Sequence, residues 1–176
     1  PLRVQVYPCV LSYPSLFEKK SWKSDEGEDK SYYSTELWFY TTDPRYAENY
    51  QTLYAAKMAA IAQKWGANPP HKMYDPIRGL NEKENPPEEQ GFFIRCKTPT
   101  RPAVRKKDPN SPPGQTQYID VTDPEDVYPG IIAAVSLTAS PFDSPKQKGV
   151  SFWLNQVVLL RDGVRLGGGS NRSAEE

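Results

Sequence analysis

Residues 31–42 alternate between two kinds of side chain, and this alternation limits the fold more than any other feature of the sequence. Successive side chains of a β-strand point to opposite faces, so a period of two predicts a strand. One predicted face carries Tyr32, Ser34, Glu36, Trp38 and Tyr40. The other face carries Tyr33, Thr35, Leu37 and Phe39. We therefore expect a strand with aromatic rings on both faces.

Further strands are predicted where short apolar patterns lie between turn residues. They cover residues 3–17, 91–98, 118–121, 131–141 and 149–161, and a proline is expected to bend the first. Within 91–98, one face carries Phe93, Arg95 and Lys97, and the other carries Phe92, Ile94 and Cys96. In the last strand, Trp153 alternates with Phe152 and Leu154, so its ring is expected to point away from the core.

One helix is predicted over residues 44–65, between the second and third major strands. Asp43 is a suitable N-cap, Pro44 suits the first helical position, and Gly66 suits the end. Apolar side chains spaced by three and four are expected to face the core. These are Tyr50, Leu53, Tyr54, Met58, Ile61 and Trp65.

The fold class expected from this order is mainly β with one long helix. A closed or partly closed antiparallel barrel is economical because it leaves no exposed strand edge, and a two-sheet sandwich is the alternative. The 18 prolines gather in long connections, chiefly 67–90 and 99–117. We expect one domain over residues 1–166 and a flexible C-terminal tail over residues 167–176.

Several kinds of chemistry have little support in the sequence. Catalysis by a Ser-His-Asp or Cys-His group would depend on His71, which lies in a proline-broken loop. Cys9 and Cys96 are interpreted as reduced core residues. The longest apolar run, 131–135, is far shorter than a membrane span, and no secretory leader is visible. We expect a cytoplasmic protein without metal, cofactor or membrane contact.

The formal net charge is zero, from 22 basic and 22 acidic residues, but the charges are unevenly distributed. Between residues 91 and 107 there are six basic side chains and no acidic one: Arg95, Lys97, Arg101, Arg105, Lys106 and Lys107. Acidic clusters are expected to lie apart from this stretch, at 25–29, 82–89 and 120–126. Cations neutralise phosphates and exposed rings stack on unpaired bases, so the pattern favours single-stranded nucleic acid.

Two other functions stay open on the residues alone. A non-catalytic structural or adaptor β-protein fits the same strands. A metal-dependent nuclease would need Mg²⁺ held by carboxylates, and Asp120, Asp123, Glu125 and Asp126 are the candidates. Asp123 lies in a turn, however, where an aspartate commonly caps backbone groups.

Short strings along most of the chain carry a resemblance to a known family. They are LSYPSLFE at 11–18, VYPG at 127–130, KGVSFWLNQV at 148–157, LRDG at 160–163 and LGG at 166–168. Taken together over about residues 10–170, they resemble the single-stranded DNA-binding proteins of tailed bacteriophages. The resemblance implies an OB-fold, a five-stranded Greek-key barrel with long inserted loops.

The resemblance also implies a role: coating single-stranded DNA, without sequence preference, during phage replication, recombination or repair in the cytoplasm of the infected host. The proposed DNA-binding residues are Trp22, Tyr32, Trp38, Tyr40, Phe93 and Trp153, with Arg95, Lys97, Arg101, Arg105, Lys106 and Lys107. An acidic tail in the family contacts phage or host replication proteins, whereas this tail carries two acids, Glu175 and Glu176. We also expect cooperative self-association on DNA. A phage structural or assembly protein is the alternative.

Overall fold

The computed structural model describes residues 2–23 and 29–166, apart from the side chains of Trp22, Lys23 and Asp29. Five long strands close into a barrel: β1 (Arg3–Lys23), β2 (Asp29–Tyr40), β4 (Gly91–Thr98), β7 (Ile132–Asp143) and β8 (Lys148–Arg161). Their order is β4-β2-β1-β7-β8, all antiparallel, and β8 returns to pair with β4 in parallel. This closed barrel is the arrangement of an OB-fold, as expected.

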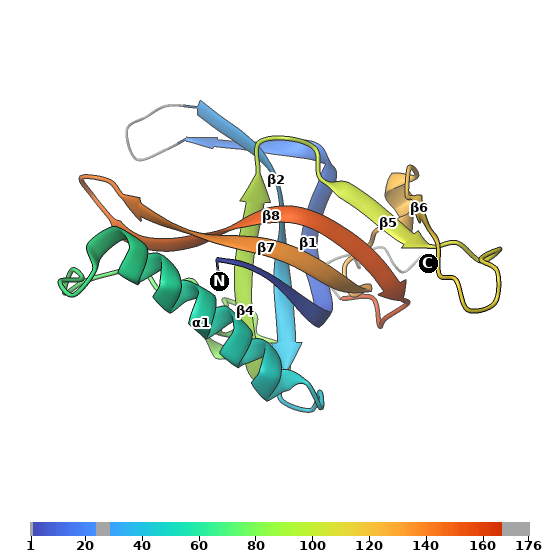
Figure 1. Cartoon of the computed structure of the whole chain (residues 1–176), viewed down its shortest axis with the longest axis horizontal. Helices are drawn as coiled ribbons and strands as arrows, with labels where there is room; N and C mark the ends of the chain where they lie inside the picture. Colours follow the sequence, from blue (N-terminus) through green and yellow to red (C-terminus); the bar gives the residue numbers. More distant parts are fainter. Residues whose placement is uncertain (1, 24–28, 167–176) are drawn as a thin grey trace.

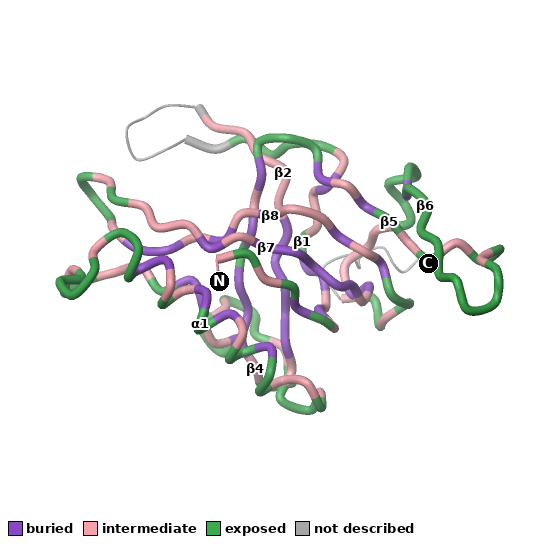
Figure 2. The backbone as a smooth tube through the Cα atoms, viewed as in Figure 1, coloured by how far each residue is buried: buried purple, intermediate pink, exposed green. Residues whose placement is uncertain are grey.

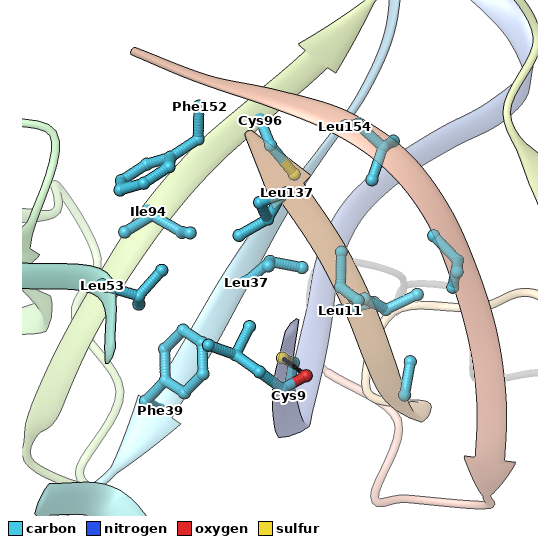
Figure 3. Packing of buried hydrophobic residues seen from close by; sticks show 14 of the residues in the cluster. Cys9, Leu11, Leu37, Phe39, Leu53, Ile94, Cys96, Leu137, Phe152 and Leu154 are labelled. Atoms are coloured by element: carbon cyan, nitrogen blue, oxygen red, sulfur yellow. Dashed lines mark hydrogen bonds between the residues drawn. The ribbon is translucent and has the colours of Figure 1, made fainter. Parts of the chain in front are cut away.

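The barrel interior is filled by the apolar face that the alternation predicts. Leu11, Leu37, Ile94, Leu137 and Phe152 come from the five barrel strands and are fully or almost fully buried. Figure 3 shows their side chains converging between the strands. Truncating one of these leucines to alanine would cost about 2–5 kcal/mol of folding free energy. Because the inner face is committed to this core, any binding surface must lie on the outer face or at the ends of the strands.

Helix α1 (Tyr46–Trp65) packs against β1, β7 and β8 along one side of the barrel (Figure 1). It begins two residues later than predicted, because the Asp43 carboxylate accepts the backbone N–H of Arg45 in a turn before it. The predicted apolar face was wrong in part. The buried residues are Asn49, Leu53, Ala56, Ala60 and Ile61. Alanines allow the helix to lie close to the strands, which turns Tyr50, Tyr54 and Met58 outward, 36 to 42 % exposed.

The long connections carry short elements that the sequence pattern did not show in full. The first contains β3 (Arg78–Gly79), which pairs with β4, and the 3-10 helix η1 (Leu80–Glu82). The second contains β5 (Ala103–Lys107), where a loop was expected. β5 pairs with β8 in parallel and with β6 (Tyr118–Asp120), and the 3-10 helix η2 (Pro124–Asp126) follows. Figure 1 shows β5 and β6 extending to the right as an arm.

The strands and the loops differ in how far they are buried. Figure 2 shows the barrel strands buried along their middles, whereas β6 and much of the loop surface are exposed. Among residues 2–23 and 29–166, no helix combines the length and apolar character that crossing a membrane requires.

Candidate nucleic-acid interface

An open groove with a volume of about 800 Å³ lies between the distal parts of the β1–β2 and β7–β8 hairpins, over the outer face of β4. These two hairpins extend toward the same side of the barrel (Figure 1). Rings line the groove from several elements: Tyr13, Tyr32, Tyr74, Phe142 and Trp153. The basic side chains in its lining are Lys20, Lys30, Arg95 and Lys97, and the acidic one is Glu36. The groove therefore combines rings with an excess of positive charge.

The centre of the groove is a cation set against two rings. Lys97 of β4 pairs with Trp153 of β8 where the barrel closes, and with Ser34 of β2 on its other side. The Lys97 Nζ atom lies 4.7 Å from the centre of the Tyr32 ring and 5.6 Å from that of Trp153. The two ring centres are 6.0 Å apart, and their planes are inclined by 54°. Three elements distant in sequence thus bring one ammonium and two rings together.

Burial lowers the pKa of Lys97, and the nearby Lys30 ammonium lowers it further. Both effects disfavour the charged form of the side chain. A phosphate in the groove would act in the opposite direction, because an anion favours the charged form. The electrostatics at Lys97 therefore suit an anionic ligand.

Glu36, the acidic residue of the groove lining, contacts three donors. Its Oε1 atom accepts the indole N–H of Trp38 at 2.9 Å and pairs with the Lys83 ammonium at 2.8 Å. Its Oε2 atom accepts the Nε–H of Arg95 at 3.2 Å. The Lys83 ammonium lies 4.3 Å from the centre of the Phe93 ring. Glu36 therefore connects β2 and β4 with the loop that follows η1.

The expectation that the Trp38 and Phe93 rings are open for stacking needs correction. Both lie on the predicted outer face, paired across β2 and β4, but they are only 6 % and 3 % exposed. Leu80 of η1 packs against them, with Leu166 at the edge of this cluster. Tyr40 packs against the same cluster and is half-buried, away from the groove lining. A loop distant in sequence covers these rings, which strand periodicity does not predict.

The residues of the predicted basic stretch lie in different parts of the structure. Arg95 and Lys97 line the groove, whereas Arg105, Lys106 and Lys107 lie on the β5–β6 arm. Acids that were expected to lie apart are beside them: Arg105 Nε is 3.3 Å from an Asp120 carboxylate oxygen, and Lys106 Nζ is 4.0 Å from one of Asp126. The arm is therefore less positive than its basic residues suggest.

Two predicted residues remain, Arg101 and Trp22, and Arg101 is not among the residues that line the groove. The guanidinium of Arg101 packs 4.9 Å from the centre of the Phe17 ring. Trp22 is in β1 near the hairpin end, and its side chain lies outside the described residues.

Sequence reasoning missed three rings of the groove. Tyr74 and Phe142 contact each other with ring centres 6.2 Å apart, where Tyr74 bridges to Gly149. A Cβ atom at Gly149 would lie 2.6 Å from the Tyr74 carbonyl oxygen, so this approach requires glycine. Tyr13 has a φ of 50° and is 58 % exposed. The irregular pairing between Ser12 and Ser15 provides its setting, and no periodicity predicts such a bulge.

Other chemical groups lie away from the groove or inside the fold. Cys9 and Cys96 are free and buried, and burial raises the pKa of both thiols. His71 is exposed in its loop. Within the described part of the chain, no group of three His, Cys, Asp or Glu side chains is placed to hold a metal ion.

Comparison with known proteins finds one matching family and several similar folds. The family described as Enterobacter phage Enc34, ssDNA-binding protein, matches residues 3–176. No curated protein matches the chain. Among solved structures, the chain is similar to the single-stranded DNA-binding protein from bacteriophage Enc34 in complex with ssDNA, with a TM-score of 0.70, 17 % identity, and coverage of 94 % of this chain and 90 % of that one.

The chain is also similar to gp2.5, a single-stranded DNA-binding protein encoded by bacteriophage T7. The TM-score is 0.58 and the identity is 17 %, over 99 % of this chain and 93 % of that one. At these identities the solved structures establish the shared fold, and the OB-fold expectation is confirmed.

Proposed function

Since this chain belongs to the single-stranded DNA-binding protein family of Enterobacter phage Enc34, we propose that it binds and coats single-stranded DNA during phage replication, recombination or repair. The observation that carries the proposal is the groove centre, where the Lys97 ammonium lies against the Tyr32 and Trp153 rings. The partner is single-stranded DNA, bound without cofactor and without a chemical step.

The mechanism in this proposal is physical. Phosphates would contact Lys97, Arg95, Lys20 and Lys30, releasing counterions, so affinity would fall steeply with salt. Unpaired bases would stack on Tyr32 and Trp153, at about 1–3 kcal/mol for each ring. Every base has a π-face, so stacking of this kind does not distinguish sequences. Tyr13, Tyr74 and Phe142, which also line the groove, would offer further stacking surfaces.

The wider roles are part of the same proposal. Residues 1–166 would form the DNA-binding domain, whose cations on the β5–β6 arm would contact DNA leaving the groove. Residues 167–176 lie outside the described residues. We propose that they contact phage or host replication proteins in the cytoplasm of the infected bacterium. Deleting them should leave the affinity of the purified protein for single-stranded DNA within about twofold, whereas a loss of tenfold or more would place part of the DNA site in the tail.

A gel-shift experiment tests the function directly. The protein is mixed with a single-stranded deoxythymidine oligonucleotide or with a duplex of equal length, each with and without Mg²⁺. We expect a shift of the single strand, a much weaker shift of the duplex, and no shortening of either. Absence of any shift would favour a structural or assembly protein. Shortened products that require Mg²⁺ would show a nuclease.

A further inference from the structure

An acid in a groove for phosphates is unexpected, because its charge repels the ligand. Glu36 nevertheless lies on the outer face of β2, directly opposite Arg95 of β4, and is only 8 % exposed. Its two oxygens accept from Trp38, Lys83 and Arg95 at 2.8 to 3.2 Å. Three donors therefore hold this nearly buried carboxylate in one position.

Glu36 contacts Arg95 through Nε, so the terminal part of the guanidinium can still face a ligand. The contact uses Nε, and the Arg95 side chain stays 58 % exposed. Among residues 2–23 and 29–166, no side chain other than Glu36 forms an ion pair with Arg95, whose two terminal nitrogens lie farther along the side chain than Nε. Those nitrogens form the planar fork that matches two phosphate oxygens. The Phe93 ring lies beneath the group, with its centre 5.5 Å from Cζ, and restricts it further.

The charge of Glu36 is largely balanced on its other side. Lys83 and Glu36 have equally buried side chains, each 10 % exposed, and Lys83 lies on the loop rather than in the groove lining. The Lys83 ammonium offsets the carboxylate locally, so a phosphate at Arg95 meets little net repulsion. Holding a long side chain in place before binding also lowers the conformational entropy lost on binding.

We propose that Glu36 is a positioning residue for DNA binding, which holds Arg95 ready for phosphate and so strengthens binding although it is itself an acid. This inference rests on the proposed function. It predicts that removing a negative charge from the groove weakens the binding of a polyanion. Electrostatics without positioning predicts the opposite sign.

The test substitutes Glu36→Gln and measures affinity for a deoxythymidine oligonucleotide. Glutamine is nearly isosteric but has one oxygen and an NH₂ group, so it cannot accept from all three donors. We expect affinity to fall roughly three- to tenfold. The matched control is Glu125→Gln on η2, an exposed acid outside the groove lining that removes the same charge. The control should bind as tightly as the parent protein or slightly more tightly.

A second variant keeps the inference testable if Glu36→Gln fails to fold. Arg95→Lys keeps one positive charge at an exposed position but lacks the planar fork, so it cannot hold Glu36 through one nitrogen and offer two others to a phosphate. We expect it to lose about as much affinity as Arg95→Gln. In the Arg95→Gln background, the further change Glu36→Gln should have no additional effect on affinity, because the side chain to be positioned is already gone.

The outcomes separate this inference from the proposed function. If the parent protein binds no single-stranded DNA, the proposed function fails. If the parent binds and Glu36→Gln binds equally or more tightly, positioning is overturned and the function stands. Arg95→Lys binding as tightly as the parent would overturn it as well.

Discussion

The Lys97 ammonium lies 4.7 Å from the centre of the Tyr32 ring, so a lysine of β4 and a tyrosine of β2 share one position in the groove. In the proposed complex, this contact would present a positive charge and a stacking surface to the same nucleotide. It also places a partly desolvated amine where a phosphate would restore favourable electrostatics.

The first prediction concerns pH. Burial and Lys30 lower the pKa of Lys97 in the free protein, and a bound phosphate would raise it. Binding should therefore be tightest at pH values below the pKa of Lys97 in the free protein. Affinity should fall as the pH rises from that pKa to the higher pKa of Lys97 in the DNA-bound protein. Titrations with oligonucleotide from neutral pH to about pH 10 should show this fall in the parent and a flatter profile in Lys97→Gln. Equal profiles would mean that Lys97 does not contact phosphate.

The second prediction concerns the stacking rings. Trp153→Ala and Tyr32→Ala should each weaken binding by about 1–3 kcal/mol, because each removes one base-stacking surface. Trp153→Phe should keep most of the affinity and lose much of the tryptophan fluorescence quenching that accompanies binding. Trp38→Phe is the control: its ring is 6 % exposed, so quenching should persist in that variant. Quenching lost with Trp38 and kept without Trp153 would place the bases on the covered cluster instead.

The third prediction concerns Tyr13, whose backbone conformation is strained. Its φ of 50° lies in the left-handed region, which asparagine adopts more readily than tyrosine. Tyr13→Asn should leave the free energy of unfolding unchanged or raise it by up to about 1 kcal/mol, while weakening DNA binding through loss of the ring.

The control for Tyr13 is Tyr7→Asn in the same strand. Tyr7 packs on the Arg45 guanidinium, 3.9 Å from Cζ, and lies outside the groove lining. This variant should destabilise the fold and leave the affinity of the folded protein unchanged. Chemical denaturation and oligonucleotide titration measure both quantities. A large loss of stability in Tyr13→Asn, with affinity intact, would show that Tyr13 serves the fold alone.

The fourth prediction concerns the acids beside the arm. Asp120 pairs with Arg105, so Asp120→Asn should release a cation and strengthen single-stranded DNA binding by a few-fold at low salt. Glu48→Gln on α1 is the matched control, because it releases Arg45 from an exposed pair outside the groove lining. If both variants gain affinity equally, the effect is that of net charge and gives no support for DNA on the arm.

Strand periodicity predicted the faces of the barrel well. It placed Arg95 with Lys97 on the outer face of β4, and it turned Trp153 away from the core between Phe152 and Leu154; the structure confirms both. These predictions succeeded because alternation is a local property of a strand. The face that alternation assigns is fixed by the backbone of each strand, whatever lies over it.

Long-range contacts limited the rest. Leu80 covers Trp38 and Phe93, and Asp120 reaches Arg105, through loops whose paths no local pattern specifies. On α1, apolar spacing selected Tyr50 and Met58 for the core, but close packing on the strands required small side chains such as Ala56. Tyr74 and Phe142 meet only because the barrel folds their segments together.

The central claim is that more phosphate contacts are made in the groove than on the arm, and the salt dependence of binding tests it most directly. Two double variants remove equal charge: Arg95→Gln with Lys97→Gln in the groove, and Arg105→Gln with Lys107→Gln on the arm. Affinities are measured from about 50 to 200 mM salt. The slope of log affinity against log salt should become shallower by about 1.4 in the groove variant, and by less than about half that in the arm variant. An unchanged slope in the groove variant, with the full change in the arm variant, would contradict the claim.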